Sequence, residues 1–199
     1  MALASAEREV HEALDALKAP FVVHHDLVLP RTGAPVEHLV LGPTGVFLVE
    51  AKRYANPVIV RGRVAHCGGR SMGPVVDQAA RRAAAVRSVL GVEVRAVLCV
   101  LSPLEPDGKR DRLVVDGVEL TSARWLTRVL TRKGTGLSYE ALVRLAALTV
   151  VRFAPKERRP CACGGDLVVR RRKSDGAALL TCSRHPVCRV AEPVALRSA

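Results

Sequence analysis

In the first 150 positions, segments whose apolar residues recur with the period of a helix alternate with apolar runs typical of strands. A stripe of helical period predicts a helix over residues 5–17. The stripe consists of Leu3, Glu7, Val10, Leu14 and Leu17. The run FVVHHDLVL over 21–29 predicts a strand, and two apolar runs around a Gly-Pro-Thr-Gly turn predict a β-hairpin over 37–52. We therefore expect a helix followed by antiparallel strands.

The pattern after the hairpin continues to alternate. Residues 57–67 predict a short β pair, and the alanine-rich stretch 75–90 predicts a helix that ends at Gly91. The unbroken apolar run over 94–101 is typical of a buried central strand, which places its cysteine, Cys99, in the core. Two more helices are expected near 122–131 and 138–150. This order predicts an α/β (α+β) fold, with helices packed on a mixed sheet.

The open end of the predicted hairpin carries two carboxylates and a lysine. A symmetric turn gives the pairs Leu41–Val46, Leu39–Leu48 and Glu37–Glu50. Period two puts Lys52 on the same face as Glu50. Opposed carboxylates in a partly dry site repel each other unless they share a cation, and Mg²⁺ prefers such oxygen ligands. The alternative is a surface hairpin end with a simple contact between Glu50 and Lys52.

Two helical residues could join this group. Glu7 lies in the apolar stripe of the first helix, which would aim a third carboxylate at the sheet. Alternatively, it complements the helix macrodipole near the N-terminus. Gln78 flanks the apolar stripe of the helix over 75–90, where it could bind a water or a phosphate, or could simply be solvated.

The charge of the chain indicates the class of its partner. The 199 residues carry a formal net charge of +12, and 49% of them are hydrophobic, as in an ordinary globular protein. Such a charge favours a polyanion, nucleic acid before an anionic membrane, although it could also serve solubility alone. The N-terminus lacks the pattern of a signal peptide, and no apolar stretch approaches the roughly 20 residues of a membrane span. We therefore expect a cytoplasmic protein without a membrane partner.

A compositional break divides the chain. Residues 151–199 carry 11 basic and 4 acidic residues, a net charge of +7. The polar, proline-bounded segment APKERRP predicts a linker over 154–160, between domains at 1–153 and 161–199. The second domain contains the motifs CAC and CSRHPVC. Without a secretion signal, such cysteine clusters indicate metal ligands rather than disulfides.

The motifs AEREVHEAL, VEHLVLGPTGVFLVEAKRY and DQAARRAAAV resemble the nuclease-related domain (NERD), a branch of the PD-(D/E)XK nucleases. The resemblance covers roughly residues 5–130. It implies a restriction-endonuclease-like sheet and phosphodiester hydrolysis that depends on Mg²⁺ or Mn²⁺. The catalytic residues it implies are Glu7, Glu37, Glu50, Lys52 and Gln78, with the three glutamates as metal ligands. The family usually has aspartate at the position of Glu37, and a displacement of about 1 Å can lower a rate about 100-fold.

The segment from GGDLVVR to HPVCR resembles the C-terminal zinc-finger module of bacterial type I topoisomerases, and implies a zinc ribbon that binds nucleic acid. The Zn²⁺ ligands carried over are Cys161, Cys163, Cys182 and Cys188. The first pair is C-x-C where that family has C-x-x-C, so His185 remains a possible substitute ligand. Nucleic-acid contacts are expected from Arg53 in the first domain and from Arg170, Arg171, Arg172, Lys173, Arg184 and His185 in the second.

Two functions remain open at this point. The first is a metal-dependent nuclease that acts on nucleic acid, with DNA as the favoured substrate, and is targeted by the zinc ribbon. The second is a nucleic-acid-binding adaptor that keeps the nuclease fold without turnover.

Overall fold

The computed structural model describes residues 2–30, 32–61, 63–105, 113–132, 136–155, 159–171 and 178–193. The chain forms two compact units, residues 2–156 and residues 157–199. No helix among these described residues is long and apolar enough to cross a membrane.

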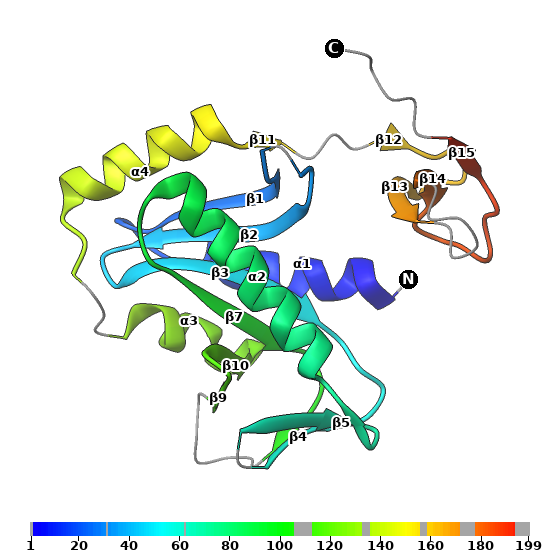
Figure 1. The fold of residues 1–199 in the computed structure, drawn as a ribbon, viewed down its shortest axis with the longest axis horizontal. Coiled ribbons are helices and arrows are strands. Elements are labelled where there is room, and N and C mark those ends of the chain that lie inside the picture. The colour runs from blue at the N-terminus through cyan, green and yellow to red at the C-terminus, as the bar shows by residue number, and fades with distance from the viewer. Residues whose placement is uncertain are drawn as a thin grey trace. The chain divides into compact units, whose positions relative to one another are not determined.

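The larger unit is a mixed sheet with helices on both faces (Figure 1). Its helices are α1 (Ala2–Asp15), α2 (Gly73–Leu90), α3 (Ala123–Thr131) and α4 (Tyr139–Arg152). Its main sheet runs in the order β11-β1-β2-β3-β7-β10-β9. The strands are β1 (Val22–Val28), β2 (Pro35–Gly42), β3 (Gly45–Lys52), β7 (Val94–Val100), β9 (Leu113–Val115), β10 (Val118–Ser122) and β11 (Ala154–Pro155). This architecture confirms the expected α/β class.

The connection from β3 to β7 places a helix over one face of the sheet. The two strands are parallel, and parallel neighbours need a crossover, which here contains α2. Met72 precedes the helix, and Gly91 ends it in the left-handed conformation, with φ 70°. Figure 1 shows α2 crossing β3 and β7. Because β7 also pairs with β10 in parallel, the centre of the sheet is buried on both sides.

The side chains of alternate residues of the central strands pack into two separate cores, one on each face of the sheet. The face under α2 and α4 includes Leu39, Leu41, Val46, Leu48 and Leu98. The opposite face, under α1 and α3, includes Val40, Phe47, Val49, Val97 and Cys99. Leu39 and Leu41 of β2 and the even-numbered residues of β3 therefore point toward α2, because side chains alternate along a strand.

Two smaller sheets complete the fold. In the larger unit, β4 (Val58–Arg61), β5 (Val64–Cys67), β6 (Arg70–Ser71) and β8 (Leu104–Glu105) form a sheet in the order β6-β5-β4-β8. In the smaller unit, β12 (Arg159–Pro160), β13 (Asp166–Arg171), β14 (Ala178–Cys182) and β15 (Ala191–Pro193) form a sheet in chain order.

Most elements lie where the sequence predicts them, and the hairpin register is confirmed as far as the pair His38–Val49, whereas the predicted pair Glu37–Glu50 is not among the described pairs of this ladder. Leu41 pairs with Val46 and Leu39 with Leu48, around a turn closed by Gly42 and Gly45. The sequence pattern did not predict β10, although it is a buried central strand, because its five residues include Glu119, Thr121 and Ser122. The predicted linker over 154–160 contains strand residues at both ends: Pro155 pairs with β1, and Arg159 pairs with β13.

Candidate functional site

The open end of the β2–β3 hairpin brings two glutamates and a lysine together. The ladder runs to the pair His38–Val49, and the next residues on the two strands are Glu37 and Glu50. The Nζ atom of Lys52 lies 3.2 Å from Oε1 of Glu37 and 3.1 Å from Oε2 of Glu50. The ammonium group therefore bridges two carboxylates that would otherwise repel each other.

The second oxygen of Glu37 is held by the backbone of the neighbouring strand. The N–H group of Ala51 donates a hydrogen bond of 2.8 Å to Oε2 of Glu37. This bond and the contact with Lys52 engage both carboxylate oxygens of Glu37. The side chain of Glu37 is therefore positioned by two neighbours on β3.

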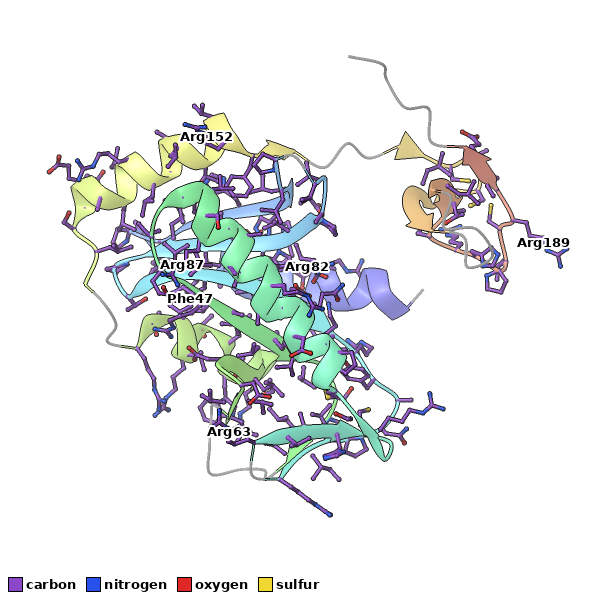
Figure 2. The ribbon with its side chains drawn as sticks, in the orientation of Figure 1. Phe47, Arg63, Arg82, Arg87, Arg152 and Arg189 are labelled. Carbon is purple, nitrogen blue, oxygen red and sulfur yellow. The ribbon has the colours of Figure 1, made fainter. Side chains whose placement is uncertain are left out.

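Helix α2 adds a fourth charged residue, Arg82. Its Nη1 atom lies 2.9 Å from Oε1 of Glu50. Glu50 is only 1% exposed, whereas Arg82 is 17% exposed. Figure 2 labels Arg82 on α2. Sequence reasoning missed this residue, although an arginine beside the apolar stripe of a helix that crosses an acidic strand end could have indicated it.

The four charges balance one another, yet Glu50 keeps capacity for a further ligand. Its two oxygens lie at ion-pair distance from Lys52 and Arg82. Each oxygen contacts one cation, which leaves a second lone pair on each for a further ligand. Carboxylate oxygens with free lone pairs at a buried strand end fit a hard divalent cation. Glu37 and Glu50 could hold such an ion if Lys52 moved aside.

Burial and charge shift the pKa values of this cluster. Burial raises the pKa of Glu37, although the charge of Lys52 and the bond from Ala51 oppose that rise. Burial alone would lower the pKa of Lys52, but the charges of Glu37 and Glu50 outweigh it and raise the pKa overall. Lys52 is therefore a cation at neutral pH. As a cation it can orient a water or stabilise negative charge.

The remaining predicted residues of the larger unit lie on α1, on α2 and directly after β3. Glu7 belongs to α1, but its side chain lies outside the described residues. Gln78 is exposed on α2, one turn before Arg82. Arg53 follows Lys52, and its Nη2 atom lies 2.6 Å from a carboxylate oxygen of Glu9 on α1. The structure thus brings Glu37, Glu50 and Lys52 together, and adds Arg82.

In the smaller unit, four cysteines converge as predicted. Their sulfur atoms all lie within 4.8 Å of one another. Sγ of Cys161 is 3.7 Å from Sγ of Cys188, and Sγ of Cys163 is 3.4 Å from Sγ of Cys182. Tetrahedral zinc with Zn–S bonds near 2.3 Å separates its sulfurs by about 3.8 Å. The four free thiols therefore suit a Zn²⁺ ion, despite the short C-x-C spacing.

The backbone around the cysteines supports this arrangement. The N–H group of Arg184 donates to Sγ of Cys182 at 3.4 Å. A Cβ atom at Gly165 would lie only 2.9 Å from the same sulfur, so glycine is required there for space. His185 is exposed, and the four thiols already supply a complete ligand set. His185 is therefore not needed as a substitute ligand.

The basic residues predicted to contact nucleic acid are only partly described. Arg184 is exposed, and its guanidinium group donates to the carbonyl oxygen of Cys163. Arg172 and Lys173, together with the side chains of Arg170 and Arg171, lie outside the described residues. Arg189 is a further exposed arginine near the cysteines, labelled in Figure 2.

The fold and the hairpin cluster define the larger unit as a mixed α/β domain with an acidic, lysine-containing site. A family model described as the nuclease-related domain, NERD, matches residues 2–102, just over half of the chain. The chain belongs to the nuclease-related domain family. The matched segment contains Glu37, Glu50, Lys52 and Arg82. Searches of curated proteins and of solved structures found no match.

Proposed function

We propose that this protein is a divalent-metal-dependent nuclease that hydrolyses phosphodiester bonds in nucleic acid, with DNA as the substrate to test first. The observation that carries the proposal is the convergence of Glu37, Glu50 and Lys52 within a domain of the nuclease-related family. The net charge of +12 supports a polyanionic substrate.

Glu37 and Glu50 are the proposed ligands of Mg²⁺ or Mn²⁺, with Glu7 as a third carboxylate and Gln78 beside a bound water or phosphate. The ion would supply Lewis-acid stabilisation of the phosphoryl group and an activated water. Lys52, moved aside to admit the ion, would remain a cation near the two carboxylates, where it could orient that water or balance charge on the phosphoryl oxygens. Arg82 keeps the carboxylate of Glu50 in place from the side of α2.

The smaller unit is proposed as a zinc ribbon that targets the nuclease to nucleic acid. Cys161, Cys163, Cys182 and Cys188 would hold Zn²⁺. The exposed side chains of Arg184, His185 and Arg189, with Arg53 in the larger unit, would contact phosphates. The free cysteines fit a reducing compartment, and we propose the cytoplasm.

The test is cleavage of single-stranded, duplex and branched DNA and of RNA, with Mg²⁺ or Mn²⁺ and after chelation. We expect cleavage by the wild type that requires the metal, and a loss of about 100-fold or more in Lys52→Ala. Lys18→Ala is the matched control, because Lys18 is exposed outside the cluster, and it should cut like the wild type. If the wild type cuts none of these substrates, the nuclease proposal fails.

The second candidate is an adaptor that binds nucleic acid without cutting it. The specific observation in its favour is that Lys52 and Arg82 already neutralise Glu50, so the cluster is balanced without a metal. This candidate predicts that the same DNA panel binds in a mobility-shift assay and stays intact, and that Lys52→Ala binds as the wild type does. Metal-dependent cleavage would exclude it.

A further inference from the structure

Three histidines form a second cluster in the larger unit, on the opposite face of the sheet from Glu50. They come from three elements: His11 from α1, His25 from β1 and His38 from β2. One ring nitrogen from each lies within 4.8 Å of the others. None of them belongs to the hairpin site or to the cysteine cluster.

The fold itself brings these rings together. His25 and His38 are directly paired residues of the antiparallel β1–β2 ladder, so their side chains leave the same face of the sheet. This face is the one that α1 covers through Val10 and Leu14. His11 follows Val10 on α1, and its ring stacks on His25 with 3.7 Å between the ring centroids.

The carboxylate of Asp15 contacts two of the rings and fixes their orientation. Oδ2 of Asp15 lies 3.2 Å from Nε2 of His11, and Oδ1 lies 3.1 Å from Nε2 of His25. A carboxylate on one imidazole nitrogen leaves the other nitrogen, Nδ1, as a lone pair for a metal. Carboxylate–histidine pairs of this kind commonly support metal ligands, because they fix both the tautomer and the ring orientation.

The third ring is buried and contacts His25. His38 is 3% exposed, and its Nδ1 atom lies 2.8 Å from Nδ1 of His25. A neutral imidazole is the form that binds a metal. Ligand nitrogens about 2.0–2.1 Å from a tetrahedral Zn²⁺ ion lie about 3.3 Å apart. Because the lone pair of an imidazole lies in the plane of its ring, the stacked rings of His11 and His25 would turn out of their stacking to point at one ion.

We propose that His11, His25 and His38 form a site for Zn²⁺ or a similar divalent transition ion, with Asp15 orienting His11 and His25. Three imidazoles supply three positions of a tetrahedral ion, and a water would complete it. Such a site would join α1 to the β1–β2 ladder. The alternative is that the cluster does not bind a metal, and that Nδ1 of His38 and Nδ1 of His25 simply share a hydrogen bond.

The first test is metal stoichiometry, with full-length protein that carries no polyhistidine tag. After incubation with Zn²⁺ and removal of unbound ion, we expect elemental analysis to find one Zn fewer per chain in His11→Gln than in the wild type. The glutamine can still hydrogen-bond to Asp15 but is a poor zinc ligand. The matched control is His66→Gln, because His66 lies on β5 outside the cluster and should leave the count unchanged.

The second test is thermal stability of the same proteins in increasing Zn²⁺. A ligand that binds only the folded state raises the melting temperature, so zinc should stabilise the larger unit of the wild type and of His66→Gln more than that of His11→Gln. If the wild type, His11→Gln and His66→Gln all fold, bind the same number of Zn²⁺ ions and show the same rise in melting temperature, the proposed site is wrong. The comparison does not depend on the proposed function, because neither cleavage nor the cysteine ligands change between these variants.

Discussion

Glu50 is held in the protein by cations from two different elements. Lys52 comes from its own strand and Arg82 from the helix above, and Glu50 itself is 1% exposed. Removing one partner of a buried ion pair leaves a charge without compensation, which is far more costly than losing a surface pair.

The first residue-scale prediction therefore concerns Arg82→Ala. We expect the free energy of unfolding to fall by about 2–3 kcal/mol, less than the 3–5 kcal/mol typical of a broken buried pair, because Lys52 remains and Arg82 is partly exposed. Urea unfolding measures the change. Arg81→Ala is the matched control on the exposed side of α2 and should stay within about 0.5 kcal/mol of the wild type. Equal effects of the two substitutions would contradict the role given to Arg82.

A second residue-scale prediction concerns Cys99, which is fully buried in the core under α1. Burial, with a smaller contribution from the charge of Glu9, raises the pKa of its thiol to about 12. The reactive form of cysteine is the thiolate, so its reactivity should appear only as the pH rises toward that value.

Native protein treated with iodoacetamide at about pH 8 should therefore keep Cys99 unmodified, as read by peptide mass spectrometry. The partly exposed Cys67 should be alkylated under the same conditions and serves as the internal control. Denaturant should make both thiols react. Alkylation of Cys99 at the rate of Cys67 in the folded protein would show that the core under α1 opens readily.

At the scale of an element, the turn that carries Cys161 and Cys163 depends on a glycine. Because a Cβ atom at Gly165 would lie 2.9 Å from Sγ of Cys182 and 3.1 Å from Oγ of Ser183, Gly165→Ala must displace a proposed zinc ligand. We expect the affinity of the cysteine cluster for Zn²⁺ to fall about 10-fold or more, measured by competition with a chromophoric chelator.

The control for that substitution is Ala162→Ser, which changes the exposed residue between the two cysteines without approaching a sulfur. Its zinc affinity should match that of the wild type. If Gly165→Ala also bound Zn²⁺ with wild-type affinity, the packing of this turn against Cys182 would not govern the metal site.

At the scale of the whole molecule, the excess of basic residues makes the proposed binding of nucleic acid dependent on salt. Each phosphate contact that a cation neutralises should reduce affinity about 3.5-fold when the salt concentration rises fourfold. Arg189→Ala removes an exposed cation of the smaller unit and should lower the slope of log affinity against log salt by about 1.

Fluorescence anisotropy with a short labelled DNA, repeated across a salt series, measures that slope. Arg144→Ala is the control, because Arg144 is an exposed residue of α4 whose guanidinium group lies 3.7 Å from Glu140. The slope of this control should equal that of the wild type. A slope unchanged in Arg189→Ala, or lowered equally in both variants, would remove Arg189 from the binding surface.

Local patterns in the chain were sufficient to predict the hairpin and the cysteine cluster. The register of β2 and β3 follows from a short symmetric turn between two apolar runs, because a slip of one residue would move every side chain to the other face. That register places Glu37, Glu50 and Lys52 on one face before any tertiary contact is known. The four cysteines lie in two short segments whose spacing already indicates a metal site.

The tertiary structure alone decided which distant residues join these groups. Arg82 reaches Glu50 only because the crossover lays α2 over β3, and β10 is central only because it pairs with β7. His11, His25 and His38 share no sequence motif and meet because α1 covers the β1–β2 ladder. The sequence by itself determined the contacts that follow from local periodicity and short turns. Contacts between distant segments were decided by packing, because helix placement depends on the whole hydrophobic core.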